Sequence, residues 1–190
     1  EERTRHAVRA LVNCLAREAG PELAPWIHLG ATSSDITETA RSLQYRESLD
    51  GFLLPQLVEL LSVWVELAER EAATPQIGRT HGQHAVPITF GFTMALYVER
   101  LGGRIEELRR VRDRLVGKLT GAVGAYNALS LLVGDPQDFE RRVLARLGLE
   151  PALVTSQILP PEPFADLFHV LTSTFGVLAN FADDMRHLQR

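Results

Sequence analysis

The chain has 190 residues and a formal net charge of −4 at pH 7, from 20 basic and 24 acidic side chains. This balance argues against a nucleic-acid-binding domain, which usually displays a strongly basic surface. The single cysteine, Cys14, excludes an internal disulfide framework and a cysteine-rich zinc site. With 45% hydrophobic residues and a length typical of one domain, the chain has enough apolar side chains for a core. No window of about 18 apolar residues is free of charge, which argues against a membrane-spanning helix.

The chain begins at Glu1 rather than at a methionine, and helical patterns run to both of its ends. We therefore expect a piece of a longer protein, without a signal peptide at its start.

Helical spacing of apolar residues runs through the whole chain, and no strand is predicted. A first helix is expected from the N-terminus to about Ala19, because Gly20 and Pro21 form a stop signal. A loop is expected over residues 20–35.

A long second helix is expected from Asp35 to about residue 72, with Asp35 as its N-cap and Glu38 as the acid three residues later. Pro55 should kink this helix or split it in two. Two adjacent apolar stripes make its apolar face wider than a surface helix needs, which places it inside a bundle. The stripes comprise Leu53, Leu57, Leu60, Trp64 and Leu67, and Leu54, Val58, Leu61, Val65 and Ala68.

A loop is expected over residues 73–91, and a third helix from there to about Leu115. Residues 117–136 are glycine-rich and irregular, a short helix spans about 136–147, and the last helix begins near Pro161 or Pro163. The third helix should bury Val98, Leu101, Ile105, Leu108, Val111 and Leu115. The last helix carries a heptad seam expected to be core, formed by Phe164, Phe168, Leu171, Phe175, Leu178, Ala182 and Met185. The predicted fold is all-α, an elongated bundle of long helices.

Three polar segments hold groups that simple turns between helices do not need. In the first, Thr32, Ser33 and Ser34 precede Asp35 at a helix start, where hydroxyl and free N–H groups can bind a carboxylate or phosphate. The alternative is an ordinary serine-rich N-cap.

The second polar segment spans residues 79–84, where His81 is placed to act as an acid or a base. The alternative is a solvent-exposed loop histidine. His81 and His84 form an H-x-x-H pair, but Gly82 disfavours a helix and no third ligand is evident, so a zinc site is weakly supported.

The third polar segment spans residues 117–124, where glycines would let the backbone approach a ligand and Lys118 could contact an anion. Its alternative is a plain loop between helices. A phosphate-binding Walker loop is rejected because Arg112 stands where that motif requires glycine. His28, which follows Trp26 closely, is predicted to be a packing residue.

Four segments carry a family resemblance, and in chain order they read HLGATSSD (28–35), GRTHGQHAVP (78–87), GAVGAYNA (121–128) and TSQI (155–158). They resemble the adenylosuccinate lyases, a family of the fumarase/aspartase superfamily, and the resemblance covers essentially the whole chain. It implies elimination of fumarate from a succinyl-amino nucleotide in purine biosynthesis, without a metal or organic cofactor. It also implies a cytoplasmic homotetramer with shared active sites, and no nucleic-acid or membrane partner.

The resemblance further implies that residues 1–26 end an N-terminal helical domain and that residues 27–190 form part of the central helical bundle. The C-terminal domain and the serine loop that supplies the family's base would follow the last helix. His81 matches the general acid and His6 a second active-site histidine. The matched substrate-binding residues are Thr32, Ser33, Ser34, Thr80, Lys118, Asn127 and Gln157.

Two positions depart from the family pattern. Ala7 stands where the family commonly has aspartate, and residues 159–164 supply neither the histidine nor the arginine that usually follows Gln157. The substrate therefore stays open between a succinyl nucleotide and that of a sister enzyme such as a carboxymuconate cycloisomerase. A non-catalytic, self-associating helical module is the alternative from a different functional class.

Overall fold

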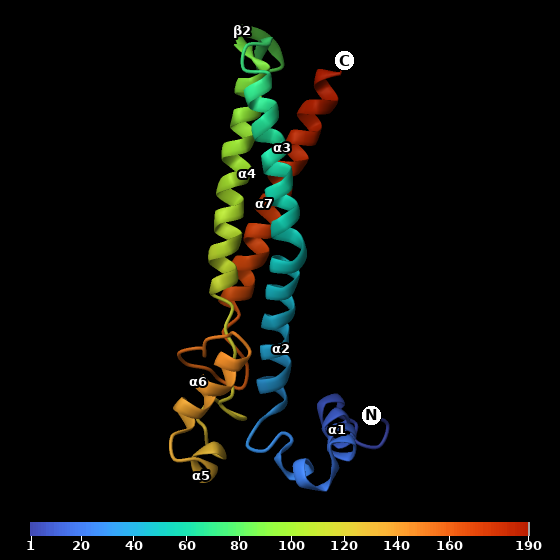
Figure 1. The fold of residues 1–190 in the computed structure, drawn as a ribbon, viewed down its shortest axis with the longest axis vertical. Coiled ribbons are helices and arrows are strands. Elements are labelled where there is room, and N and C mark those ends of the chain that lie inside the picture. Colours follow the sequence, from blue (N-terminus) through green and yellow to red (C-terminus); the bar gives the residue numbers. More distant parts are fainter. Residues whose placement is uncertain (190) are drawn as a thin grey trace. The chain divides into compact units, whose positions relative to one another are not determined.

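The computed structural model describes residues 1–189 and divides the chain into two compact units (Figure 1). Unit 1 combines residues Glu1–Tyr45 with Leu115–Pro161. Unit 2 combines Arg46–Arg114 with the segment from Glu162 onward. Most described residues are helical, so the predicted helical fold is confirmed.

Unit 2 is built from three long helices and a β-hairpin: α3 (Leu54–Arg70), β1 (Pro75–Thr80), β2 (Gln83–Thr89), α4 (Phe90–Asp113) and α7 (Glu162–Leu188). Helix α4 packs against both α3 and α7. Three aromatic rings join the helices, with centroid distances of 4.3 Å for Trp64–Phe181 and 5.9 Å for Trp64–Tyr97. The Tyr97 hydroxyl donates a hydrogen bond to the Asp184 carboxylate of α7.

Unit 1 contains α1 (Ala7–Leu23), η1 (Ala24–Trp26), most of α2 (Ser33–Ser48), and the short helices α5 (Leu129–Leu132) and α6 (Pro136–Arg146). Helix α1 begins at Ala7, later than predicted, because the Nδ1 atom of His6 accepts a hydrogen bond from the Arg9 N–H and caps the helix. Gly20, at φ 79°, interrupts the helix as the stop signal predicted, and a further turn ends at Leu23.

The start of α2 differs from the prediction by two residues. The helix begins at Ser33, and Asp35 is not the N-cap. Instead, the Asp35 carboxylate accepts the Thr32 N–H at 2.8 Å, as the acid of a capping box does. The expected break near Pro55 is confirmed: α2 passes into the π-helical segment η2 (Leu49–Leu53), and Pro55 lies in the first turn of α3, where its missing N–H is tolerated.

Residues 73–91 were expected to form a loop and the chain to lack strands, but two strands within this segment form a β-hairpin. Strands β1 and β2 pair antiparallel, with Gln76 opposite Ile88 and Thr80 opposite Gln83. His81 and Gly82 form a two-residue turn with φ angles of 54° and 71°, as a type I′ hairpin requires. Both strands are largely exposed, so they lack the alternation of apolar and polar residues that identifies a strand in a sequence.

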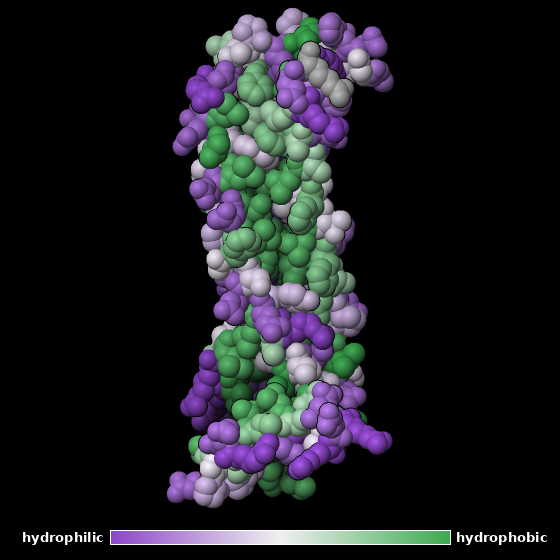
Figure 2. All heavy atoms as spheres, turned by 90° about the vertical axis from the view of Figure 1, so that its right-hand side faces the viewer, coloured by the Kyte–Doolittle hydropathy of each residue, from purple (hydrophilic) through white to green (hydrophobic). Residues whose placement is uncertain are grey.

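The apolar stripes of unit 2 are only partly buried. The stripe on α4 is confirmed from Leu101 to Val111. The predicted seam of α7 is wrong, because the buried residues are Leu167, Val170, Thr174 and Val177, whereas Phe168 and Phe175 are 48% and 68% exposed. On α3, Leu57 and Trp64 are buried, while Val58 and Val65 of the second stripe are exposed. Figure 2 shows apolar side chains gathered along the surface of the helices.

Two helical stretches, Ser33–Arg70 and Glu162–Leu188, are long and apolar enough to cross a membrane by length and composition alone. The core helices of soluble bundles meet the same criteria.

The dependence of the stability of unit 2 on alkaline pH tests whether the Tyr97 hydroxyl is held neutral by its surroundings. Burial, and then the hydrogen bond to Asp184, raise the pKa of Tyr97 from 10.0 to about 12. The neutral phenol therefore stabilises the fold fully below about pH 10, and this stabilisation is lost as the pH rises toward 12. We expect Tyr97→Phe to flatten the fall in melting temperature over this range, measured by circular dichroism. An equally steep fall in the variant would contradict this assignment.

Candidate active site

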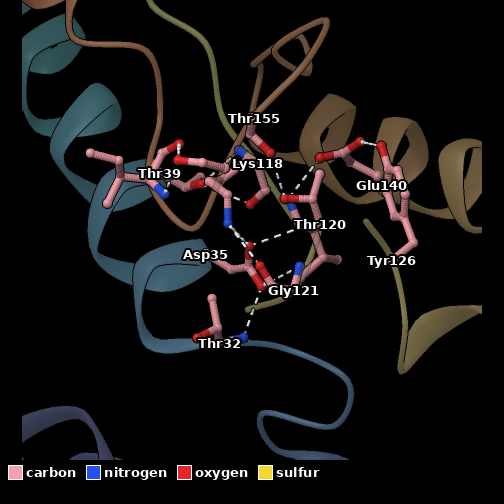
Figure 3. Close-up of polar contacts among 12 residues, drawn as sticks. Thr32, Asp35, Thr39, Lys118, Thr120, Gly121, Tyr126, Glu140 and Thr155 are labelled. Carbon is pink, nitrogen blue, oxygen red and sulfur yellow. Dashed lines mark hydrogen bonds and ion pairs between the residues drawn. The ribbon is translucent and has the colours of Figure 1, made fainter. Parts of the chain in front are cut away.

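The buried face of α2 is polar in unit 1. Asp35, Thr39 and Ser42 follow one another at helical spacings of four and three residues, and all three are buried. Each bonds to the backbone of residues 116–121, and Figure 3 shows the contacts of Asp35 and Thr39. The Thr39 hydroxyl donates to the Lys118 carbonyl and accepts the Lys118 N–H, and the Ser42 hydroxyl donates to the Val116 carbonyl at 2.7 Å. These side chains hold an irregular segment against the helix.

The Asp35 carboxylate accepts four hydrogen bonds. Its Oδ1 atom accepts the Lys118 ammonium and the Thr120 N–H, and its Oδ2 atom accepts the N–H groups of Gly121 and Thr32 (Figure 3). A buried carboxylate needs such partners, because removing it from water is otherwise very unfavourable. Since one oxygen binds both Thr32 and Gly121, the start of α2 lies beside the glycine loop, which we define as residues 121–126.

The expectation that Lys118 contacts substrate is corrected by its burial. Its side chain is fully buried, and its ammonium donates to Asp35 and to the Gly121 carbonyl. The sequence suggested that Lys118 binds the anion of a ligand, but the anion that it binds is the carboxylate of Asp35 in the same chain. Its role is to hold the glycine loop in place.

A pocket of about 370 Å³ lies at the start of α2. It brings together His6 of the α1 cap and Thr32 and Ser33, which the family resemblance implied to be parts of one site. Arg9 also lines this pocket, and the positive end of the α2 dipole adds to its positive charge. The pocket therefore favours an anionic group, in keeping with the predicted carboxylate site. Ser34, the next residue of the helix, is not among its lining residues.

His28 lines the same pocket, although the sequence indicated a packing residue. Its backbone has φ 64°, an uncommon conformation for a residue other than glycine. Its Nε2 atom is buried and has no hydrogen-bond partner among residues 1–189. The histidine thus lines the pocket with a ring nitrogen that makes no hydrogen bond among the described residues. A positive φ at a single residue does not alter the spacing of apolar residues, so the sequence carries no sign of this placement.

The segments of Asn127 and Gln157 meet through the glycine loop. Gly124, at φ 79°, lies so close to the Thr155 carbonyl oxygen that an added Cβ atom would be 2.1 Å from it. The Thr120 and Thr155 hydroxyls share a hydrogen bond of 2.7 Å. Asn127 and Gln157 are both exposed beside these contacts, so their amide groups are accessible to a ligand.

Thr80 and His81 belong to unit 2 and are described by themselves. Both are exposed, and His81 forms the tip of the hairpin. A pocket of about 560 Å³ lies beside the hairpin, lined by Arg79 and by Asp184 and His187 of α7, but not by Thr80 or His81. Among the described residues, no group of three or more histidine, cysteine or acidic residues could hold a metal ion.

Known proteins resemble the chain over almost its whole length. A profile of a lyase family matches residues 1–190. The adenylosuccinate lyase of Pyrococcus abyssi is 41% identical over 187 residues, covering 97% of this chain and 40% of that protein. That of Methanothermobacter thermautotrophicus is 36% identical over 191 residues, covering 100% and 42%. The chain therefore spans about two fifths of the length of these relatives.

Two solved structures also resemble this chain over almost its whole length. A fumarate lyase from Mesorhizobium sp. BNC1 matches with a TM-score of 0.87 and 29% identity, over 99% of this chain and 43% of that one. A 3-carboxy-cis,cis-muconate lactonizing enzyme from Pseudomonas putida matches with a TM-score of 0.82 and 29% identity, over 95% and 41%. The predicted superfamily fold is confirmed.

The buried ion pair predicts a large effect on stability. Lys118→Met removes the cation and leaves the Asp35 carboxylate buried, so we expect a loss of about 3–5 kcal/mol in the free energy of unfolding. Arg41→Met is the matched control, because Arg41 pairs with Glu38 on the exposed side of the same helix and should contribute less than about 1 kcal/mol. Urea denaturation measures both, and equal losses in the two variants would refute the role assigned to Lys118.

Proposed function

Because the chain belongs to this lyase family, we propose that the protein containing it is an adenylosuccinate lyase. The enzyme would eliminate fumarate from adenylosuccinate, and from the related succinyl-carboxamide nucleotide, in purine biosynthesis in the cytoplasm. The observation that carries the proposal is the identity of up to 41% with adenylosuccinate lyases over nearly the whole chain.

Cleavage of the C–N bond requires three groups. A base removes the proton from the carbon beside a carboxylate, positive dipoles or cations stabilise that carboxylate as it gains charge, and an acid protonates the leaving nitrogen. In this proposal His81 is the acid, and the exposed hairpin tip gives its imidazole access to a substrate. The family's serine loop would supply the base, so no residue described here is given that role.

The carboxylate would bind at the start of α2. Thr32 and Ser33 line a pocket with His6, and the N–H groups of the first helical turn lie at the positive end of the helix dipole. Ser34, in the same turn, would add a hydroxyl group. His6 would act as the second active-site histidine, near the charged groups of the substrate.

Three other residues would contact the remainder of the substrate: Thr80 beside His81, and Asn127 and Gln157 beside the glycine loop. Lys118 has no such role, because its side chain is fully buried.

The muconate-lactonizing enzyme favours a second candidate function. Its fold matches this chain at 29% identity, and Ala7 together with residues 159–164 departs from the adenylosuccinate lyase pattern. A cycloisomerase acting on a carboxymuconate would also need a carboxylate site and an acid–base pair. Assays of the full-length protein with both substrates separate the two functions.

We also propose that the full-length protein is a homotetramer whose active sites combine residues of several subunits. Phe168 and Phe175 of α7 and Val58 and Val65 of α3 are exposed, and contiguous apolar surfaces of this kind usually mark interfaces. Residues 1–26 would end the N-terminal domain, and residues 27–190 would form part of the central helical bundle.

Substitution of His81 tests the proposed acid. In the full-length protein, His81→Ala should lower the rate of fumarate release by about 10²- to 10⁴-fold, the usual contribution of a general acid. His84→Ala is the matched control, since His84 lies on the same hairpin three residues away. Absorbance of fumarate follows both reactions. Wild-type turnover in the His81 variant would show that another residue is the acid.

Substitution of Phe175 tests the proposed interface. Phe175→Asp places a charge on the exposed apolar face of α7 and should shift the full-length protein from tetramers toward smaller species. His169→Asp, which is exposed about 120° around the same helix from Phe175, controls for added charge outside the proposed interface. Light scattering gives the mass of each species. A tetramer that tolerates Phe175→Asp would place the interface elsewhere.

A further inference from the structure

Glu140 of α6 is a buried acid that neither the sequence motifs nor the proposed chemistry uses. It is 2% exposed, and its Oε1 atom accepts the Leu119 N–H at 2.7 Å. Its Oε2 atom accepts the hydroxyl hydrogen of Tyr126 (Figure 3). Leu119 lies two residues before the glycine loop and Tyr126 is its last residue, so one carboxylate binds the chain on both sides of the loop.

The backbone of this loop is unusual at several positions. Gly121 and Gly124 have φ angles of 80° and 79°, and Tyr126 has φ 56° although it carries a side chain. This left-handed conformation is unfavourable for tyrosine, so surrounding contacts must hold it. The Tyr126 N–H donates to the Thr120 carbonyl at 2.8 Å, and the phenol bond to Glu140 fixes the other end of the residue.

Packing alone does not account for a carboxylate at this position. No ion pair among the described residues includes Glu140, so its charge is balanced only by neutral donors. An apolar side chain would avoid the unfavourable burial of charge, but it would leave Leu119 and Tyr126 without their acceptor. Burial, and then the hydrogen bond to Glu140, raise the pKa of Tyr126 above its ordinary value, so the phenol stays protonated and donates well beyond neutral pH.

The loop ends beside a proposed substrate contact. Ala122, Val123 and Asn127 are exposed, and Asn127 directly follows the constrained Tyr126. The direction in which Asn127 leaves the loop is therefore set by the conformation of Tyr126.

We infer that Glu140 and Tyr126 are positioning residues, which clamp the glycine loop so that Asn127 and the loop backbone meet the substrate without rearrangement. Neither side chain needs to touch the substrate. The inference rests on the proposed function for the identity of the substrate, but the clamp itself is a property of this chain.

The test uses the full-length protein with Tyr126→Phe, which removes only the hydroxyl group. Tyr97→Phe is the matched control, because the Tyr97 hydroxyl also donates to a carboxylate, that of Asp184, but lies in unit 2. If the clamp positions the loop, Tyr126→Phe should raise KM for adenylosuccinate by about 3- to 10-fold, the effect of one hydrogen bond, with kcat changed less than KM. The control should lose thermal stability without this rise in KM.

Glu140→Leu provides the second arm, because leucine is of similar size and accepts neither the Leu119 N–H nor the Tyr126 hydroxyl hydrogen. It should raise KM at least as much as Tyr126→Phe does, and the double variant should be little worse than Glu140→Leu alone, since the phenol bond is already lost in that variant. An unchanged KM in Tyr126→Phe, or an equal rise in the Tyr97 control, would overturn the inference.

Hydrogen exchange separates failure of the clamp from failure of the proposed function. If the wild-type protein does not release fumarate from adenylosuccinate, the proposed function is wrong. The clamp is then tested by the hydrogen-exchange rates of the backbone amides of residues 119–127. These should exchange about fivefold faster in Tyr126→Phe than in the wild type, whereas the Tyr97 control leaves them unchanged. Wild-type exchange rates in Tyr126→Phe would reject the clamp.

Discussion

The Asp35 carboxylate is the contact on which the arrangement of unit 1 depends. Its four donors come from the start of α2 and from a segment more than 80 residues later in the chain. A segment rich in glycine has few apolar side chains with which to pack, so hydrogen bonds to its backbone must hold it. Asp35, Thr39 and Ser42 supply these bonds from one face of a helix, and Lys118 balances the buried charge.

In the proposed function, the two units would supply different groups for the elimination reaction. In unit 1, buried polar groups fix backbone N–H groups and hydroxyls around a pocket that favours an anion, and preorganised dipoles of this kind stabilise developing charge without rearrangement. In unit 2, the exposed imidazole of His81 is carried on a tight turn, where it can exchange protons with a bound molecule. In the proposed function, the anion site and the acid are two of the three groups that removal of fumarate requires, and the family's serine loop would supply the base.

The long helices were predicted from apolar spacing and the superfamily from local motifs, whereas the place of His6 in one site with Thr32 and Ser33 was implied only by the family resemblance. The sequence did not predict the hairpin, whose exposed strands have no apolar alternation. It also misplaced Lys118, because a lysine beside glycines looks the same whether it binds a ligand or a buried carboxylate 83 residues away in the chain. On α7, the heptad pattern marked Phe168 and Phe175 as core, but periodicity cannot distinguish a face buried within one chain from a face left exposed. The polar 4–3 spacing of Asp35, Thr39 and Ser42 was the available signal for the polar face of α2.

The central claim is that Asp35 and Lys118 build the anion site without binding the substrate. A crystal structure of the full-length protein with fumarate bound tests this most directly. We expect a fumarate carboxylate in the pocket of His6, Thr32 and Ser33, while Asp35 still accepts its hydrogen bonds from Lys118, Thr120 and Gly121. A structure in which the Lys118 ammonium leaves Asp35 to bind fumarate, or in which fumarate binds away from the start of α2, would contradict it.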